Sequence, residues 1–161
     1  MKTRKMFRKF SALTAVVLTA LTLTACGGGK KAADVDVAKL ADELNSSVIT
    51  TDTLSEPQDT MLSSIYFFED GQLADHKIYM SNNTTADEIV VAECADEKAA
   101  KSVSDLLKTR VGNQKNLFES YNPDEAAKLD KALVKTAGKY AVMVVCDDYD
   151  KAESILKEAG F

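Results

Sequence analysis

The side chains that most readily suggest chemistry are the cysteines and the only histidine of this 161-residue chain. Cys94 and Cys146 lie 52 positions apart, a separation that fits neither a zinc site nor a redox motif. A cysteine nucleophile would need His76 beside it to accept the thiol proton. Because each cysteine ends an apolar run, we expect two buried thiols, with a disulfide bridge as the alternative, and we expect His76 at the surface.

An acidic run near the C-terminus offers a second kind of chemistry. Asp147, Asp148 and Asp150 could supply oxygen ligands to Ca²⁺, but the spacing of an EF-hand loop is absent. Asp148 as the N-cap of a helix, with Asp150 in its first turn, explains the run through the helix dipole. No carboxylate pair stands out among the 25 acidic residues, and the sequence contains no phosphate-binding loop or nucleophile elbow. We therefore expect no catalytic residues, no metal and no dissociable cofactor.

Three further side chains are candidates for a binding surface or pocket. Arg110 falls on the apolar stripe of a predicted helix, where an arginine either extends to solvent or pairs with a buried carboxylate. Tyr121 and Tyr140 lie near the ends of predicted elements, where amphipathic rings can line a recognition surface. Together with Asp148 they form the candidate set, and ordinary packing at the edge of the core is the alternative interpretation.

The N-terminal segment has the pattern of a secretion signal. Five basic residues and no acid fall within the first nine positions, and an apolar run follows from Phe10 through Leu23. The segment ends in Leu23-Thr24-Ala25-Cys26, which resembles the lipobox of bacterial lipoproteins. The resemblance implies cleavage between Ala25 and Cys26. It also implies a diacylglycerol group on the Cys26 thiol, with or without an N-acyl chain.

This pattern divides the chain into three parts. Residues 1–25 are predicted to be the lipoprotein signal peptide, residues 26–34 the lipidated cysteine with a flexible tether, and residues 35–161 a single domain. A transmembrane helix is the alternative, but the apolar run is shorter than the roughly 20 residues needed and stops at Gly27 to Gly29. We therefore expect an extracytoplasmic protein held on the cell membrane by acyl chains such as palmitate.

The mature chain is expected to be acidic. Without the five basic residues of the leader, 15 Lys and Arg residues stand against 25 Asp and Glu residues, a formal net charge of −10. Such a domain is repelled by phosphate backbones, so we expect no nucleic-acid partner. The partners that the sequence suggests are the membrane, through the anchor, and an envelope or transporter protein.

Hydrophobic periodicity predicts an α+β fold, with a small, mainly antiparallel sheet of three to four strands and helices packed on it. Helices are expected over residues 36–46, 55–66, 97–120, 123–133 and 149–159. Strands are expected over residues 76–81, 88–94 and 140–146, and the last is expected at the centre because it is apolar on both faces. Residues 65–68 also fit a hairpin strand, and Gly112-Asn113 fits a kink in the long helix. An apolar stripe from Ala99 to Tyr121 is expected to face the sheet.

The order of features from Val35 to the C-terminus resembles an uncharacterised lipoprotein family of low-GC Gram-positive bacteria (Firmicutes), which carries the domain of unknown function DUF4358. The residues that carry the resemblance are Ala86-Asp87-Glu88-Ile89, Gln114 with Phe118, Tyr121-x-Pro123, Gly138-Lys139-Tyr140 and Asp147-Asp148. These residues determine local structure, and the resemblance implies no set of catalytic residues.

These observations favour a non-enzymatic binding module, lipid-anchored at the cell envelope and accessory to an envelope or transport complex. A small envelope hydrolase is one alternative, using carboxylates or a pairing of His76 with Cys94 or Cys146. A single-domain ligand-binding component of a transporter is the other, since about 136 residues remain after the leader, too few for a two-lobed receptor.

Overall fold

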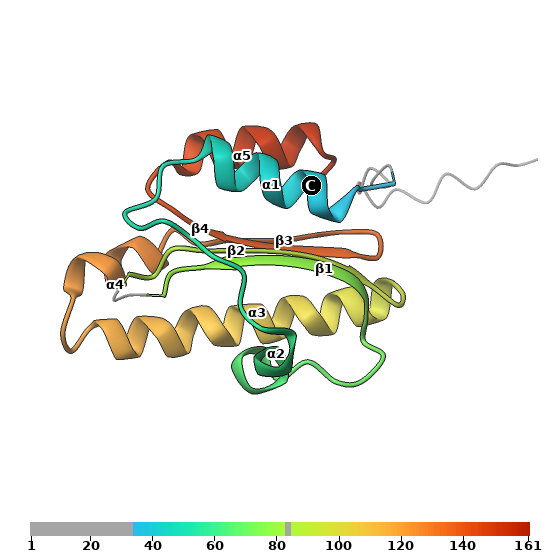
Figure 1. Cartoon of the computed structure of the whole chain (residues 1–161), viewed down its shortest axis with the longest axis horizontal. Coiled ribbons are helices and arrows are strands. Elements are labelled where there is room, and N and C mark those ends of the chain that lie inside the picture. Colours follow the sequence, from blue (N-terminus) through green and yellow to red (C-terminus); the bar gives the residue numbers. More distant parts are fainter. Residues whose placement is uncertain (1–33, 83–84) are drawn as a thin grey trace, which may run out of the picture.

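The protein is a three-layered α+β domain, seen edge-on in the computed structural model of Figure 1. The structure describes residues 34–82 and 85–161, so the predicted signal peptide, the lipobox Leu23–Cys26 and nearly all of the predicted tether lie outside the described residues. The helices are α1 (Val37–Ser47), α2 (Asp59–Tyr66), α3 (Glu97–Phe118), α4 (Pro123–Leu129) and α5 (Tyr149–Glu158). The strands are β1 (Leu73–Met80), β2 (Glu88–Cys94), β3 (Leu133–Ala137) and β4 (Tyr140–Val145).

The four strands form one antiparallel sheet in the order β1-β2-β4-β3. The two central strands are almost entirely buried, as is typical of strands that are covered on both faces. Glu88 pairs with Met80 on one side and with Val145 on the other, and Leu133 pairs with Val144. The start of β2 therefore lies at the same end of the sheet as the end of β4.

Helices α1 and α5 cover one face of the sheet (Figure 1). Both are amphipathic, and α1 buries Leu40 and Leu44 on the side that faces the strands. Asp36 accepts a hydrogen bond from Lys39 N at 3.0 Å and so caps α1, whereas Asp148 accepts one from Lys151 N at 3.1 Å and caps α5. The Asp148 cap agrees with the sequence-based expectation.

Helices α2, α3 and α4 lie on the other face, where they enclose a second apolar core (Figure 1). Helix α3 runs 22 residues without interruption, and Gly112 does not break it. Val103 and Leu107 are fully buried against the sheet. The expectation of one buried stripe is wrong at its far end, because Leu117 is 55% exposed and Tyr121 is 51% exposed. Phe118 of the same helix end is 3% exposed, so only part of the predicted stripe is buried there.

The segment after α4 differs most from the sequence-based prediction. A helix was predicted to about Leu133, but α4 ends at Leu129 and residues 133–137 form the edge strand β3. A tight turn follows the helix, in which Ala132 N donates to Leu129 O at 3.1 Å. Antiparallel pairing with β4 then overrides the helix-compatible composition of the segment.

Of residues 65–68, for which both a helix and a strand are expected to fit, Ile65 and Tyr66 form the end of α2 and Phe67 is its C-cap. Leu62 and Tyr66 lie one helical turn apart and are both buried. The helix ends at Phe67, a left-handed residue with φ 61° whose side chain is 64% exposed. Within the described ranges, no helix has the length and apolar character needed to cross a membrane.

Candidate functional site

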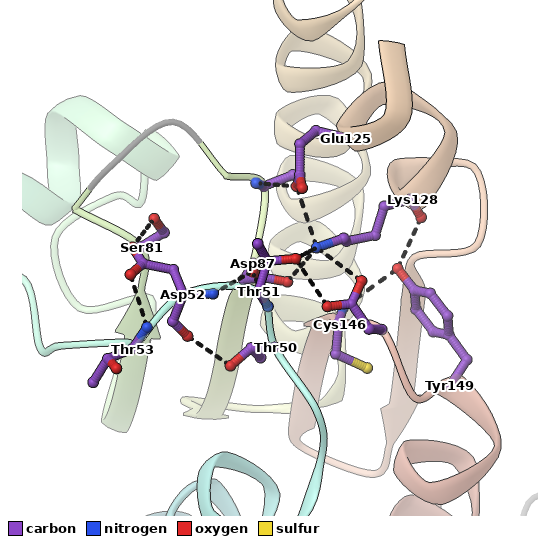
Figure 2. Close-up of polar contacts among 12 residues, drawn as sticks. Thr50, Thr51, Asp52, Thr53, Ser81, Asp87, Glu125, Lys128, Cys146 and Tyr149 are labelled. Atoms are coloured by element: carbon purple, nitrogen blue, oxygen red, sulfur yellow. Dashed lines mark hydrogen bonds and ion pairs between the residues drawn. The ribbon is translucent and has the colours of Figure 1, made fainter. Parts of the chain in front are cut away.

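Four segments that are distant in the sequence meet at the end of the sheet where β4 finishes. They are the loop after α1, the residues that open β2, helix α4, and the turn from β4 into α5 (Figure 2). The loop is held there by Asp147 N, which donates to Ile49 O at 2.8 Å. Ser81 Oγ, beyond β1, donates to Asp52 Oδ2 of the same loop at 2.6 Å. The four segments thus form one connected surface.

Lys128 of α4 is the centre of this junction. Its ammonium nitrogen lies 2.8 Å from Asp87 Oδ1, 3.0 Å from Asp147 Oδ1 and 3.3 Å from Glu125 Oε2. It also donates to Thr51 Oγ1 at 3.0 Å. Since an ammonium group carries three N–H bonds, these four acceptors use all of its donor capacity.

The carboxylates around Lys128 are themselves fixed by the backbone. Asp87 Oδ2 accepts from Thr51 N at 2.9 Å and from Asp52 N at 3.2 Å. Glu125 Oε2 accepts from Ala86 N at 2.7 Å. These bonds satisfy backbone donors that would otherwise be unpaired at the end of the sheet, so the network is a rigid connection between segments.

The electrostatics of the cluster keep Lys128 charged. Burial acts to lower the pKa of Lys128, but its hydrogen bonds to Asp87 and Asp147 outweigh burial and raise that pKa above its ordinary value. The Lys128 side chain is 7% exposed and that of Asp87 is 0% exposed, whereas the Asp147 side chain is 37% exposed. One cation among three carboxylates leaves an excess of negative charge, and Asp147 presents part of that charge to solvent.

A cavity of about 530 Å³ opens over this cluster. Such a volume is within the range of small-molecule binding sites. Four charged residues, Asp124, Glu125, Lys131 and Asp147, line it together with Lys128. The other lining residues are polar or small: Thr51, Asn122, Ala127, Cys146 and Tyr149.

Cys146 and Tyr149 form the side of the cavity that belongs to the β4–α5 turn. Tyr149 Oη donates to Lys128 O at 2.8 Å and accepts from Cys146 N at 3.4 Å, so the ring is fixed between two backbone groups. Burial raises the pKa of the Cys146 thiol to about 11 and holds that of Tyr149 well above its ordinary value. At neutral pH both groups therefore keep their protons, and the Cys146 thiol is a poor nucleophile.

Arg110 of α3 lies at a separate site, on the face of the sheet that α3 covers. Its Nε and Nη2 atoms each lie 2.7 Å from a carboxylate oxygen of Glu88, which is a bidentate ion pair. The guanidinium carbon is 4.9 Å from the centre of the Tyr66 ring, and the Tyr66 hydroxyl donates to Glu88. Of the two roles considered for Arg110, the structure shows pairing with a buried carboxylate.

The other candidate residues lie apart from one another. Tyr121 is exposed after α3 and packs against Phe118, with ring centres 5.1 Å apart. Tyr140 is buried at the start of β4, where its hydroxyl donates to Asp34 Oδ1 at 3.1 Å. Asp148 caps α5, next to Asp147 of the cavity. The structure thus brings none of the four candidates together. None of them lines the cavity, although Tyr121 and Asp148 are adjacent in sequence to the lining residues Asn122 and Asp147.

The two cysteines considered for a disulfide are free and buried. Cys94 packs in the core on the α3 side and Cys146 in the core on the α1 side, so the sheet separates their side chains. Burial raises the pKa of the Cys94 thiol also to about 11. His76 lies on β1, where its Nε2 is 3.7 Å from Asp59 Oδ1.

Comparison with known protein families gives a match for this chain. A family described as a domain of unknown function, DUF4358, matches residues 47–146. The chain belongs to this family. The matched range covers Thr51, Asp87 and Lys128, so the centre of the junction falls within the family's domain. No curated protein and no solved structure was found to match the chain.

Sequence reasoning did not identify Lys128, Asp87, Glu125 or Thr51 as a site. One local signal was available, because Glu125 and Lys128 lie three positions apart on the predicted helix. A second was the acidic pair Asp87-Glu88 directly before an apolar strand, where both carboxylates must be buried. Neither signal indicates that the partners come from four different segments.

Proposed function

We propose that this protein is a lipid-anchored module at the extracytoplasmic face of the cell membrane, and that it acts by binding at the cavity over Lys128 rather than by catalysis. It would serve as an accessory component of an envelope or transport complex. The lipobox supports the anchor, and membership in a family with a domain of unknown function is compatible with this role.

The observation that carries the binding role is the state of the groups in the cavity. Lys128 is saturated by four acceptors and kept charged, so it offers neither a free donor nor a base. The Cys146 thiol keeps its proton. A cavity whose reactive groups are occupied by one another favours recognition of a ligand over chemistry on it.

The position of the cavity fits an anchored receptor. Asp34, the first described residue, contacts Tyr140 at the start of β4, whereas the cavity lies beyond the end of that strand. In Figure 1 the start of α1 and helix α4 are at opposite ends of the molecule. A strand of six residues spans about 20 Å. A tether that leaves from Asp34 would therefore place the cavity away from the membrane.

The anchor is tested by metabolic labelling with palmitate. We expect the wild-type protein to incorporate the label and Cys26→Ala to remain an unlabelled precursor. Cys146→Ala is the matched control, since it also removes one thiol and should stay labelled. Label retained by Cys26→Ala would contradict the anchor.

The binding role is tested by native mass spectrometry of the protein purified from its own cells. We expect wild-type protein to carry a discrete bound mass that Ala127→Trp lacks, because the indole would fill the cavity without changing its charge. Ala127→Ser, which leaves the cavity open, should retain the bound mass. Equal spectra for all three proteins would contradict binding at this cavity. Release of a chemically altered compound would favour the hydrolase alternative instead.

A further inference from the structure

The cavity over Lys128 has a charge that restricts what it can hold. Asp87, Glu125 and Asp147 surround a single ammonium group, and Asp124 adds a fourth carboxylate to the lining. Lys131 is the one further cation that lines the cavity in the described part of the chain. The formal balance of the floor and lining is therefore negative, and a ligand anion would meet net repulsion.

Lys128 does not make the cavity favourable for an anion. A buried lysine in a pocket normally suggests an anion site, but all three N–H bonds of Lys128 are directed at protein acceptors. Turning the ammonium group towards a ligand would leave Asp87 and Glu125 buried without their counter-ion, which is strongly unfavourable. Lys128 thus balances charge inside the protein and contributes nothing to anion binding.

The accessible acceptors are carboxylates. Asp147 uses Oδ1 for Lys128 and Oδ2 for the Thr51 hydroxyl, and its carboxylate, which is 37% exposed, lines the cavity and can accept further hydrogen bonds. Asp124 is exposed on α4, and among residues 34–82 and 85–161 no cation pairs with it. Two accessible carboxylates in one cavity of about 530 Å³ suit a positively charged group that donates several hydrogen bonds.

We infer that the cavity binds a primary ammonium group, supplied by a small aliphatic polyamine or by the lysine side chain of a peptide. This inference rests on the proposed function and names the chemistry of its ligand. The ammonium group would lie against the exposed carboxylate of Asp147, and the aliphatic part of the ligand would extend past Ala127 and Tyr149. Lys131 would repel the ligand and set an upper limit on its charge.

The test is a calorimetric titration of the full-length protein in detergent with putrescine, with a lysine tripeptide, and with glutarate as the anionic counterpart. We expect at least one amine to bind, more weakly as salt is added, and glutarate to give no heat of binding. Putrescine binding alone would assign a polyamine, and tripeptide binding alone would assign a peptide. Glutarate binding tighter than both amines, or binding of none of the three, would overturn the inference.

Two variants that change the charge of the cavity in opposite directions locate the binding site. We expect Asp147→Asn to weaken amine binding about fivefold or more, because it removes an accessible charge, and Lys131→Met to strengthen it. Asp105→Asn removes one carboxylate on α3, outside the cavity, and should leave the affinity unchanged. Equal affinities for Asp147→Asn, Lys131→Met and wild type would exclude the cavity as the amine site.

Calorimetry and native mass spectrometry together distinguish a failure of the ammonium inference from a failure of the proposed function. If no amine binds while native mass spectrometry still shows a bound mass that Ala127→Trp loses, the ammonium inference is wrong and the binding role stands. If no amine binds and no such mass is found, both are wrong.

Discussion

At the residue scale, the most consequential side chain is Lys128. A lysine that is 7% exposed and surrounded by three carboxylates differs in kind from the ion pairs on the helix surfaces. A buried pair contributes little net stability over an apolar substitute, but removing one partner leaves uncompensated buried charge. The cluster therefore specifies how four segments meet at the end of the sheet.

Replacing Lys128 with methionine should destabilise the protein by about 3–5 kcal/mol, because Asp87 and Glu125 lose their counter-ion in the interior. The measurement is the free energy of unfolding from urea titration. Lys108→Met is the matched control: Lys108 is 59% exposed and lies 3.2 Å from Asp105, so its loss should cost less than about 1 kcal/mol. Equal costs for the two variants would contradict a buried, charged cluster.

The cysteines allow a prediction of how the stability of the protein depends on pH. Folding raises the thiol pKa of both Cys94 and Cys146 from the ordinary value of 9.0 to about 11. Because the unfolded chain loses these protons at lower pH than the folded chain, this contribution to stability is complete below pH 9 and is lost as the pH rises towards 11. We expect the urea midpoint of Cys26→Ala, whose only thiols are these two, to fall over that interval.

Thiol reactivity provides the control for that experiment. At neutral pH, iodoacetamide should alkylate the unfolded chain readily and the folded chain far more slowly, since burial limits both the thiolate fraction and access. Rapid alkylation of either cysteine in the folded protein would contradict its burial.

At the element scale, the accuracy of prediction from sequence followed the strength of the local pattern. Helices α1, α3 and α5 and strands β2 and β4 carry their own periodicity and caps, so they were placed within a few residues. The edge strand β3 is only five residues long: Val134 and Thr136 favour a strand, Lys135 and Ala137 do not, and its conformation is fixed by pairing with β4. The Lys128 cluster was missed for a related reason, because its contacts span up to 77 positions of the chain.

The long helix α3 permits a stabilising substitution. Gly112 is exposed in the helix interior, and a Cβ atom built there meets nothing within 4 Å. We expect Gly112→Ala to stabilise the protein by about 0.5–1 kcal/mol, since alanine loses less backbone entropy in a helix. Gly138→Ala is the control of opposite sign, because Gly138 has φ +54°, a left-handed conformation that disfavours alanine. Thermal unfolding of both variants measures the difference, and a loss of stability in Gly112→Ala would show that the helix is not regular at that position.

At the scale of the whole molecule, the two ends of the sheet differ in character. One end holds Asp34 against Tyr140, close to the predicted tether, and the other holds the cavity and the ion-pair cluster. Two exposed apolar side chains, Ile49 and Tyr121, directly flank segments of the junction. A domain attached at the first end would present the second to ligands that arrive from outside the membrane.

The central claim, that the cavity end contacts a ligand when the protein is in its membrane, is tested most directly by photo-cross-linking in intact cells. A benzophenone side chain is placed at Lys131, which lines the cavity, or at Lys101, an exposed lysine of α3 away from it. Mass spectrometry should identify a discrete adduct from position 131 that is absent from position 101. The same adducts from both positions, or none from position 131, would contradict a binding role for this cavity.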